Sequence, residues 1–239
     1  MRFIILISLL LSYIHSITMT PLYATLESRK DRNIIFRVTN PTKEPVAVVM
    51  SVLELIDTNH NKEKRVETDK VSYYPSQFVL NPHETKNVRV RYMKKALPPK
   101  EEVFRIIAQE LNIDLSDKMA KRLDNKIKAE VKMRFTYEGL LFVRQPDNKP
   151  KLSISKIKKS PKGVIVEIYN SGEASAIPNG ELYNYIVTTI NHKVYTLTKD
   201  DLKGAEFRRV LHGKSNQFLL KNISSIPISN IQTIRLEKK

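Results

Sequence analysis

Short runs of β-branched and aromatic residues, separated by turn residues, recur along the chain after residue 16 and constrain the fold more than any other feature. This spacing is typical of antiparallel sandwiches. The breaks between runs have physical causes. The proline of Asn40-Pro41 removes a backbone donor, and residues 81–84, NPHE, supply turn chemistry. The pattern therefore predicts an all-β protein.

The first part of the chain contains seven such runs, the strand count of an immunoglobulin-like domain. The run 103–111 also fits helical spacing through Val103, Ile107 and Leu111, so periodicity alone leaves both structures open. The predicted strands are 19–26, 33–39, 46–55, 77–80, 86–92, 103–111 and 127–137.

Residues 144–150, RQPDNKP, have the composition of a linker between two domains. We therefore predict an N-terminal immunoglobulin-like domain over 17–145 and a C-terminal β-sandwich domain over 146–239. The segments 34–40 and 164–170 are both predicted strands that end at asparagine, which suggests a duplicated plan. The strands predicted after the linker are 152–157, 164–169, 181–189, 193–197, 207–211, 217–220 and 231–236.

Residues 1–16 show the charged, apolar and polar zones of a secretory signal. The apolar run 3–11 is too short to span a bilayer. We predict cleavage after Ser16 and a mature chain that starts near Ile17 outside the cytoplasm. No later stretch approaches about 18 uninterrupted apolar residues, so no stable membrane insertion is expected. Because the chain has no cysteine, hydrophobic burial must hold the fold without disulfides.

The formal net charge of +16 makes nucleic acid, anionic surfaces and acidic proteins candidate partners. The basic residues are spread over predicted loops and strand faces, however, and no aromatic-interleaved platform accompanies them. Export also conflicts with nucleic-acid binding. We therefore predict no nucleic-acid partner and interpret most of the charge as a solvated surface.

The sequence offers little for catalysis. It has no cysteine nucleophile and no Gly-x-Ser-x-Gly motif. Its five histidines are scattered away from metal-ligand spacing, and its six glycines form no phosphate-binding loop. We therefore predict no catalytic residues, no metal site and no cofactor, and expect that the protein is not an enzyme.

Residues 127–135, IKAEVKMRF, alternate strictly between apolar and mostly charged side chains. This is the pattern of a half-buried strand. Such an apolar face can close the core of its own sandwich or serve another protein, and alternation alone favours the first. The apolar positions are Ile127, Ala129, Val131, Met133 and Phe135.

Residues 74–90, YPSQFVLNPHETKNVRV, followed by Leu97-Pro98 and by Glu101 with Val103-Phe104-Arg105, resemble periplasmic chaperones of the chaperone-usher pilus pathway. Those chaperones read P-x-Q-x-x-L-x-P-x-x-x-x-x-V-R-[VI], then L-P-x-x-x-E-x-x-[FY]. The resemblance implies two immunoglobulin-like β-sandwich domains in a boomerang arrangement with a cleft between them. It covers most of residues 17–145.

The resemblance also implies that the last strand of the first domain is lent to a pilin-like subunit, which an outer-membrane usher then receives. The lending residues would be Ile127, Ala129 and Val131, with Leu123 or Met133 as a further member. Whether the chaperone caps itself as a dimer stays open.

In this family a basic pair in the cleft binds the terminal carboxylate of the subunit. One member, a lysine, falls on Arg134, whereas the aligned first-strand stretch 22–25, LYAT, has no counterpart to the other, an arginine. Glu101 matches a carboxylate of an inter-domain ion network, and its expected arginine partner falls on Glu138. These departures suggest a divergent branch of the family.

The alternative is a two-domain β-sandwich surface or pilus protein with a structural or adhesive role. A pilin would carry a free alternating segment directly after the signal. Pro21 interrupts the ladder there, which favours the chaperone.

Overall fold

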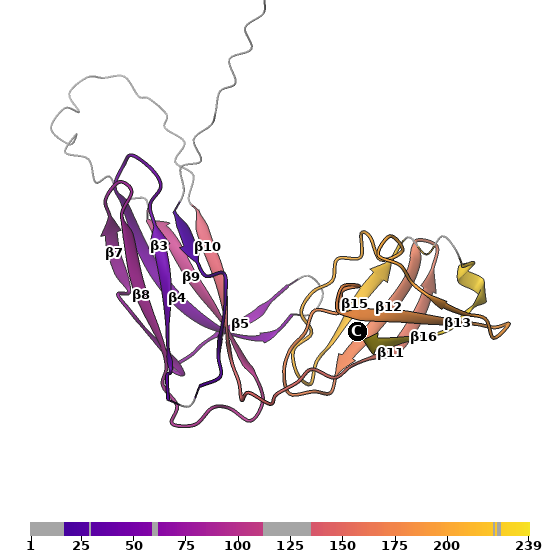
Figure 1. Cartoon of the computed structure of the whole chain (residues 1–239). Coiled ribbons are helices and arrows are strands. Elements are labelled where there is room, and N and C mark those ends of the chain that lie inside the picture. The colour runs from indigo at the N-terminus through magenta and orange to yellow at the C-terminus, as the bar shows by residue number, and fades with distance from the viewer. Residues whose placement is uncertain (1–16, 29, 59–61, 112–134, 222, 224–225) are drawn as a thin grey trace, which may run out of the picture.

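The chain folds into two β-sandwiches that meet at one end and diverge from it in a boomerang shape (Figure 1). The computed structural model describes residues 17–28, 30–58, 62–111, 135–221, 223 and 226–239. Within these residues the only helical element is the 3-10 turn η3, Ile228–Asn230. No helix among them is long and apolar enough to cross a membrane. The predicted all-β class with two immunoglobulin-like sandwiches is confirmed.

The first sandwich packs two sheets against each other. Sheet A has the order β1-β3-β8-β6, and sheet B has the order β2-β10-β9-β4-β5, with β7 paired to β4. The strands are β1 (Thr18–Thr20), β2 (Tyr23–Leu26), β3 (Asn33–Thr39), β4 (Val46–Asp57), β5 (Lys64–Glu67), β6 (Val71–Tyr74), β7 (Gln77–Leu80), β8 (Thr85–Tyr92), β9 (Glu102–Leu111) and β10 (Thr136–Val143).

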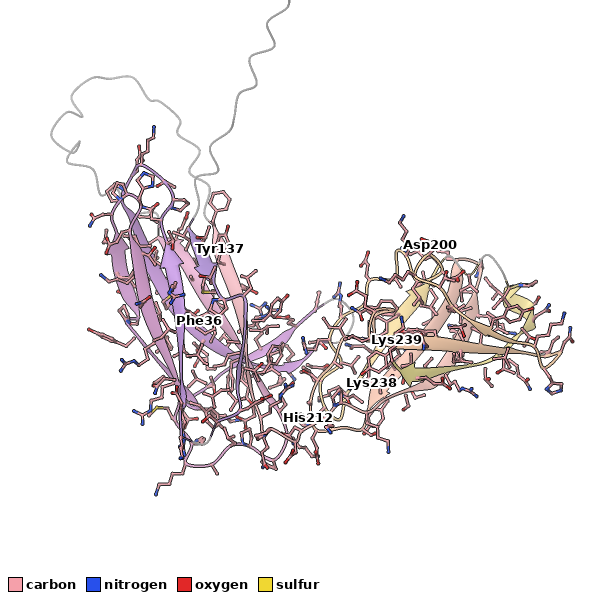
Figure 2. All side chains as sticks on the ribbon, viewed as in Figure 1. Phe36, Tyr137, Asp200, His212, Lys238 and Lys239 are labelled. Atoms are coloured by element: carbon pink, nitrogen blue, oxygen red, sulfur yellow. The ribbon has the colours of Figure 1, made fainter. Side chains whose placement is uncertain are left out.

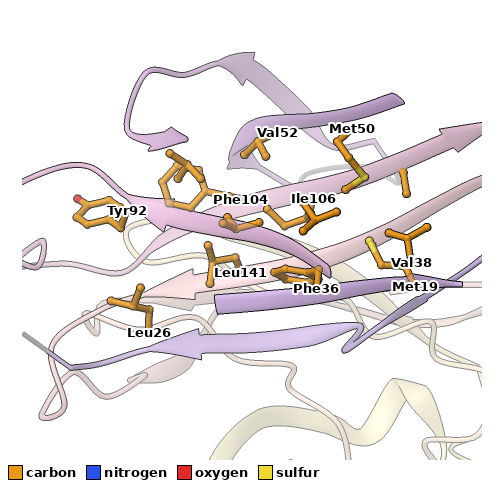
Figure 3. Packing of buried hydrophobic residues seen from close by; sticks show 14 of the residues in the cluster. Met19, Leu26, Phe36, Val38, Met50, Val52, Tyr92, Phe104, Ile106 and Leu141 are labelled. Atoms are coloured by element: carbon orange, nitrogen blue, oxygen red, sulfur yellow. The ribbon is translucent and has the colours of Figure 1, made fainter. Parts of the chain in front are cut away.

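Alternate residues of these strands point inward and fill the core of the first sandwich (Figure 3). Phe36 of β3 and Leu141 of β10 are fully buried there. Gly139 of β10 lies beside them. A Cβ at this position would stand only 3.3 Å from the ring of Phe36 and 3.2 Å from Met19. The close approach of β10 to the opposite sheet therefore favours glycine at this position.

The second sandwich has two smaller sheets. They have the orders β11-β12-β15 and β14-β13-β16. Tyr185, in the core of the second sandwich, is the largest fully buried side chain among the described residues. The strands are β11 (Leu152–Ser160), β12 (Gly163–Asn170), β13 (Tyr183–Thr189), β14 (Val194–Thr196), β15 (Ser215–Leu220) and β16 (Ile231–Lys238). The predicted domain boundary at residues 145 and 146 falls between β10 and β11 and stays a prediction.

Several strand predictions are confirmed, and the ambiguous run 103–111 is strand β9. The reason is that β9 pairs on both sides and buries residues on both faces, which removes the simple alternation of an edge strand. The predicted strand 19–26 is instead two strands. The chain changes sheet at Pro21, so β1 pairs with β3 and β2 runs parallel to β10.

Other strand predictions were wrong or incomplete. Residues 207–211 form no strand, and Val210 makes only an isolated bridge to Ala176. Strands β5 and β6 were missed because each has only four residues, and β5, KRVE, is also mostly charged. The predicted strand 127–137 lies mostly outside the described residues, and β10 begins at Thr136 and continues to Val143.

The suggested duplication has a structural counterpart in two buried asparagines. The Nδ2 of Asn40 donates to the carbonyl of Glu44, and its Oδ1 accepts the backbone N–H of Thr42. In the same way, the Nδ2 of Asn170 donates to the carbonyl of Ala174, and its Oδ1 accepts the backbone N–H of Gly172. Each asparagine therefore closes the turn after its strand in the same way, four and two residues along the chain.

Candidate functional site

The predicted site residues lie outside the described part of the chain. They are Ile127, Ala129, Val131, Met133 and Arg134. Their roles therefore remain predictions, and the described residues show what surrounds the place where this segment joins β10.

Strand β10 has an open edge along its first half. Its entire length, from Thr136 to Val143, pairs with β9. On the other side β2 pairs only with the second half, from Leu140 opposite Tyr23 onward. Among the described residues, the first half of β10 therefore has no strand on the side away from β9. An open strand edge of this kind can accept a further strand.

The two faces of β10 serve different parts of the molecule. Tyr137, Leu141 and Val143 point into the core of the first sandwich. Leu140 and Phe142 point to the opposite side, where they form a cluster with Leu55, Val103 and Leu211. Because Leu211 belongs to the second sandwich, the outer face of sheet B faces the cleft between the sandwiches.

A cavity of about 620 Å³ lies in this cleft. Tyr23 and Leu140, which are opposite each other in the pair of β2 and β10, both line it. Five cationic side chains and one carboxylate also line the cavity: Lys62, Arg65, Arg105, Arg208, Arg209 and Glu63. The cavity is therefore predominantly basic.

Two of the cations are neutralised by carboxylates. Arg65 binds Glu138 through two hydrogen bonds of 2.7 and 2.6 Å, and Arg105 binds Glu63. The bonds to Glu138 raise the pKa of the Arg65 guanidinium. Burial acts to raise the pKa of Glu63, but the hydrogen bonds from Arg105 and Arg65 outweigh it and lower that pKa. These four groups form a balanced network on the outer face of sheet B.

Arg209 differs because no carboxylate among the described residues binds its guanidinium. That group lies 4.4 Å from the centre of the Phe142 ring and 3.2 Å from the Oγ of Ser175. Burial lowers its pKa, which means that the surroundings disfavour its charge. A partly desolvated cation without a carboxylate partner is suited to receive an anion.

The expectation for the partner of Glu101 was wrong in its position. Glu101 binds Arg144, over 3.0 Å, whereas Glu138 binds Arg65. Glu101 also accepts hydrogen bonds from the backbone and hydroxyl of Ser175, so the predicted inter-domain ion network exists with Arg144 as its arginine. In the sequence this arginine stands six residues after Glu138.

The sequence did not reveal the cleft arginines. Arg105 stood within the family motif without an assigned role, and no sequence signal marked Arg65 or Arg209. The three come from different elements, β5, β9 and the stretch before β15, and only the fold brings them to one cavity. The first-strand stretch 22–25 lies beside the second half of β10. Its partners there, Leu140 to Phe142, follow Arg134 by six to eight residues in the chain.

Within the described residues, no group of acidic, histidine or cysteine side chains could hold a metal ion.

The fold is similar to that of several solved pilus chaperones. A chaperone–tip adhesin complex of CFA/I fimbriae biogenesis has a TM-score of 0.57 and 16% identity, covering 94% of this chain and 98% of that chain. The SafB chaperone in complex with the SafA pilin of Salmonella enterica has a TM-score of 0.56 and 11% identity, with 95% and 97% covered. The CsuC–CsuE complex of Acinetobacter baumannii has a TM-score of 0.55 and 14% identity, with 85% and 89% covered. At these identities the likeness shows the fold alone.

No curated protein matches the chain. The family described as pili and flagellar-assembly chaperone, PapD N-terminal domain, matches residues 18–148, more than half of the sequence. With the two sandwiches and the resemblance over 74–105, this match shows that the chain belongs to the pilus-assembly chaperone family of the chaperone-usher pathway.

Proposed function

We propose that this protein is a periplasmic chaperone that stabilises pilin-like subunits by lending them residues 127–133 and then delivers them to an outer-membrane usher. The observation that carries the proposal is the open edge of β10, whose first half pairs only with β9 among the described residues. The apolar row of residues 127–135 stands directly before that edge in the sequence.

The alternation of β10 extends the argument to the preceding residues. Its odd-numbered positions, including Tyr137 and Leu141, face the core of the first sandwich. A strand that continued back from Tyr137 with the same alternation would place Val131, Ala129 and Ile127 on that same side. This apolar side of the strand would then fill the groove of a subunit that lacks a strand.

The energies fit a carrier that must release its cargo. Four apolar side chains buried at about 1.5 to 3 kcal/mol each give a gross gain of about 6 to 12 kcal/mol. The loss of translational and rotational freedom on association costs a similar amount. Backbone hydrogen bonds along the added strand supply the rest of the affinity.

The basic cavity is suited to hold the terminal carboxylate of the subunit. The family resemblance assigns this role to Arg134, whose guanidinium can bind both carboxylate oxygens. Tyr23 and Leu140 face each other at the cleft and offer no charge, whereas Arg209 lines the same cavity and binds no carboxylate among the described residues. Six residues separate Arg134 from Leu140, about 20 Å along a strand, so Arg134 and Arg209 would not meet at one carboxylate. We therefore propose Arg209 as the contact inside the cavity, in place of the missing first-strand arginine.

The cellular setting is part of the proposal. The predicted signal over residues 1–16 would export the chain to the periplasm, where subunits and usher are available. The solved structures of CFA/I, Csu and Saf chaperones include tip adhesin or pilin subunits, which supports subunits of this type as the cargo. A chaperone role needs no catalytic residue, in keeping with a non-enzymatic family.

Co-production with a pilin-like subunit from the same organism tests the lent strand. The double variant Ile127→Asp and Val131→Asp should leave the unfolding temperature of the first sandwich unchanged. It should abolish nearly all recovery of soluble subunit from the periplasm. The matched control, Lys128→Gln and Lys132→Gln, changes the net charge by the same amount on the other face of the same segment and should retain recovery. Unchanged recovery with the first variant would refute strand lending by this segment.

A second experiment tests the anchor separately. Arg209→Ala should weaken binding of the intact subunit by about tenfold and change little for a subunit extended beyond its terminal carboxylate. The same two measurements on Arg134→Ala test the assignment that the family resemblance implies. Equal losses for both subunits would remove the anchor role while leaving strand lending intact.

A further inference from the structure

The outer face of sheet A carries arginines and no acidic side chain. We call this surface the arginine face. Arg37, Arg89 and Arg91 are exposed on it. Its residues come from alternate positions of β1, β3, β6 and β8 and are Thr18, Thr20, Asn33, Ile35, Arg37, Thr39, Ser72, Tyr74, Thr85, Asn87, Arg89 and Arg91.

The strand register shows that no cross-strand neighbour neutralises these arginines. Arg89 lies between Ile35 and Tyr74. Arg91 has Asn33 and Ser72 as neighbours, and Arg37 has Thr20 and Asn87, so neither has a carboxylate opposite it. Opposite charges across strands usually stabilise an exposed sheet face.

Sheet B provides a comparison within the same sandwich. On its outer face Arg65 binds Glu138 and Arg105 binds Glu63. No ion pair or side-chain hydrogen bond joins Arg37, Arg89 or Arg91 to the described residues. The arginine face therefore leaves three guanidiniums available to a carboxylate from another molecule.

The residue types on this face are those of a protein interface. Lysine is the commoner base in the chain, yet every cation on this face is arginine. Tyr74 is 78% exposed and Ile35 is 40% exposed, and they flank Arg89 on either side. Arginine and tyrosine are enriched in interfaces and at their energetic centres, whereas lysine is depleted. A general excess of lysine would not produce this selection.

The position of the face allows it to work while the cleft is occupied. The outer face of sheet B meets the second sandwich through the cluster that contains Leu140 and Leu211. The arginine face is the outer face of the other sheet of the same sandwich, so it lies on the side opposite that cluster. A partner bound there would leave the cleft and the open edge of β10 free.

We propose that the arginine face binds an acidic protein surface, and that it does so while a second molecule occupies the cleft. A second copy of this chain is a poor occupant because each copy carries a formal charge of +16. Bidentate bonds from the guanidiniums to carboxylates would give this interface its specificity, and Tyr74 would supply its apolar contact.

Photo-crosslinking in the producing cells tests the proposal, with p-benzoylphenylalanine at position 74. We expect one discrete adduct with another protein, joined through a peptide that contains aspartate or glutamate. The triple variant Arg37→Gln, Arg89→Gln and Arg91→Gln should reduce this adduct by about tenfold. The matched control Lys156→Gln, Lys158→Gln and Lys162→Gln removes the same charge from the second sandwich and should retain it.

Several outcomes would overturn the proposal: no discrete adduct, an adduct with a second copy of the chain, or equal reduction by both triple variants. Purified protein should also be titrated with phosphatidylglycerol vesicles and with duplex DNA. Binding to either that is lost only in the arginine variant would assign the face to lipid or nucleic acid instead. Subunit recovery is measured in the same strains, so a failure of strand lending is seen separately.

Discussion

Arg144 of the first sandwich donates a hydrogen bond of 3.0 Å to Glu101, and the same carboxylate accepts the backbone N–H of Ser175, which belongs to the second sandwich, over 2.9 Å. Glu101 is only 2% exposed. One buried carboxylate therefore joins the two sandwiches and fixes the side of the cleft that carries His212 (Figure 2).

Neutralising Glu101 should loosen this junction. Glu101→Gln should lower the free energy of unfolding by about 1.5 to 3 kcal/mol, because it removes the buried charge from a pair whose Arg144 guanidinium is 28% exposed and keeps Glu27 as a partner. Urea denaturation measures the change. Glu27→Gln, which removes the exposed partner of the same arginine, should cost less than about 1 kcal/mol. Equal costs would contradict a special role for the buried pair.

Adding a methyl group at Gly139 should strain the core. The new Cβ would stand 3.2 Å from Met19, 3.3 Å from Phe36 and 3.3 Å from a backbone oxygen, so the neighbours must move. Gly139→Ala should destabilise the first sandwich by about 1 to 3 kcal/mol, and Gly139→Val should cost more. Thermal unfolding checks this order, and a neutral effect of valine would show that β10 can shift outward.

His212 should make the junction sensitive to acid. It lines a second cavity, of about 340 Å³, beside Glu101 and Lys214. Burial lowers its pKa, and Lys100 and Lys214 lower it further. Because the folded state favours the neutral ring, its contribution to stability is complete above the ordinary histidine pKa of about 6.5 and is lost as the pH falls through the lowered folded value.

Denaturation of wild type and His212→Gln between about pH 7 and pH 4 measures this contribution. The wild type should lose stability faster than the variant as the pH decreases. Parallel curves for the two proteins would contradict the prediction.

The backbone nitrogen of Ile17 should form an ionic contact with Glu110 after export. The backbone nitrogen of Ile17, which is fully buried, donates to the Oε1 of Glu110 over 2.7 Å. Cleavage after Ser16 would turn this nitrogen into an ammonium group and strengthen the bond. Glu110→Gln should then cost about 1.5 to 3 kcal/mol in the processed chain and less in a chain that keeps residues before Ile17. A mature N-terminus at another residue would contradict this account.

Local pattern predicted the fold class well because alternation and turn chemistry are local properties. Strands β3 and β7 and the turn at residues 81–84 follow directly from such signals. The sequence showed the shared role of Asn40 and Asn170 only as two similar strands that end at asparagine. Their hydrogen bonds to distant carbonyls, such as those of Leu80 and Val210, depend on tertiary contacts.

The site was harder to predict because it is assembled across the fold. Arg65, Arg105 and Arg209 are far apart in the sequence and meet only where the two sandwiches face each other. The position of Arg144 was missed because pairing with β9 and β2, rather than alternation, sets the register of β10. The strand-lending residues themselves rest on the pattern and the family resemblance.

Amide hydrogen exchange of residues 127–133 tests the central proposal most directly. It should be measured in the purified chaperone alone and in its complex with a pilin-like subunit. The account predicts that exchange in this segment slows by at least about 100-fold on binding, because its backbone joins a ladder with the subunit. Unchanged exchange over 127–133 in a stable complex would contradict it.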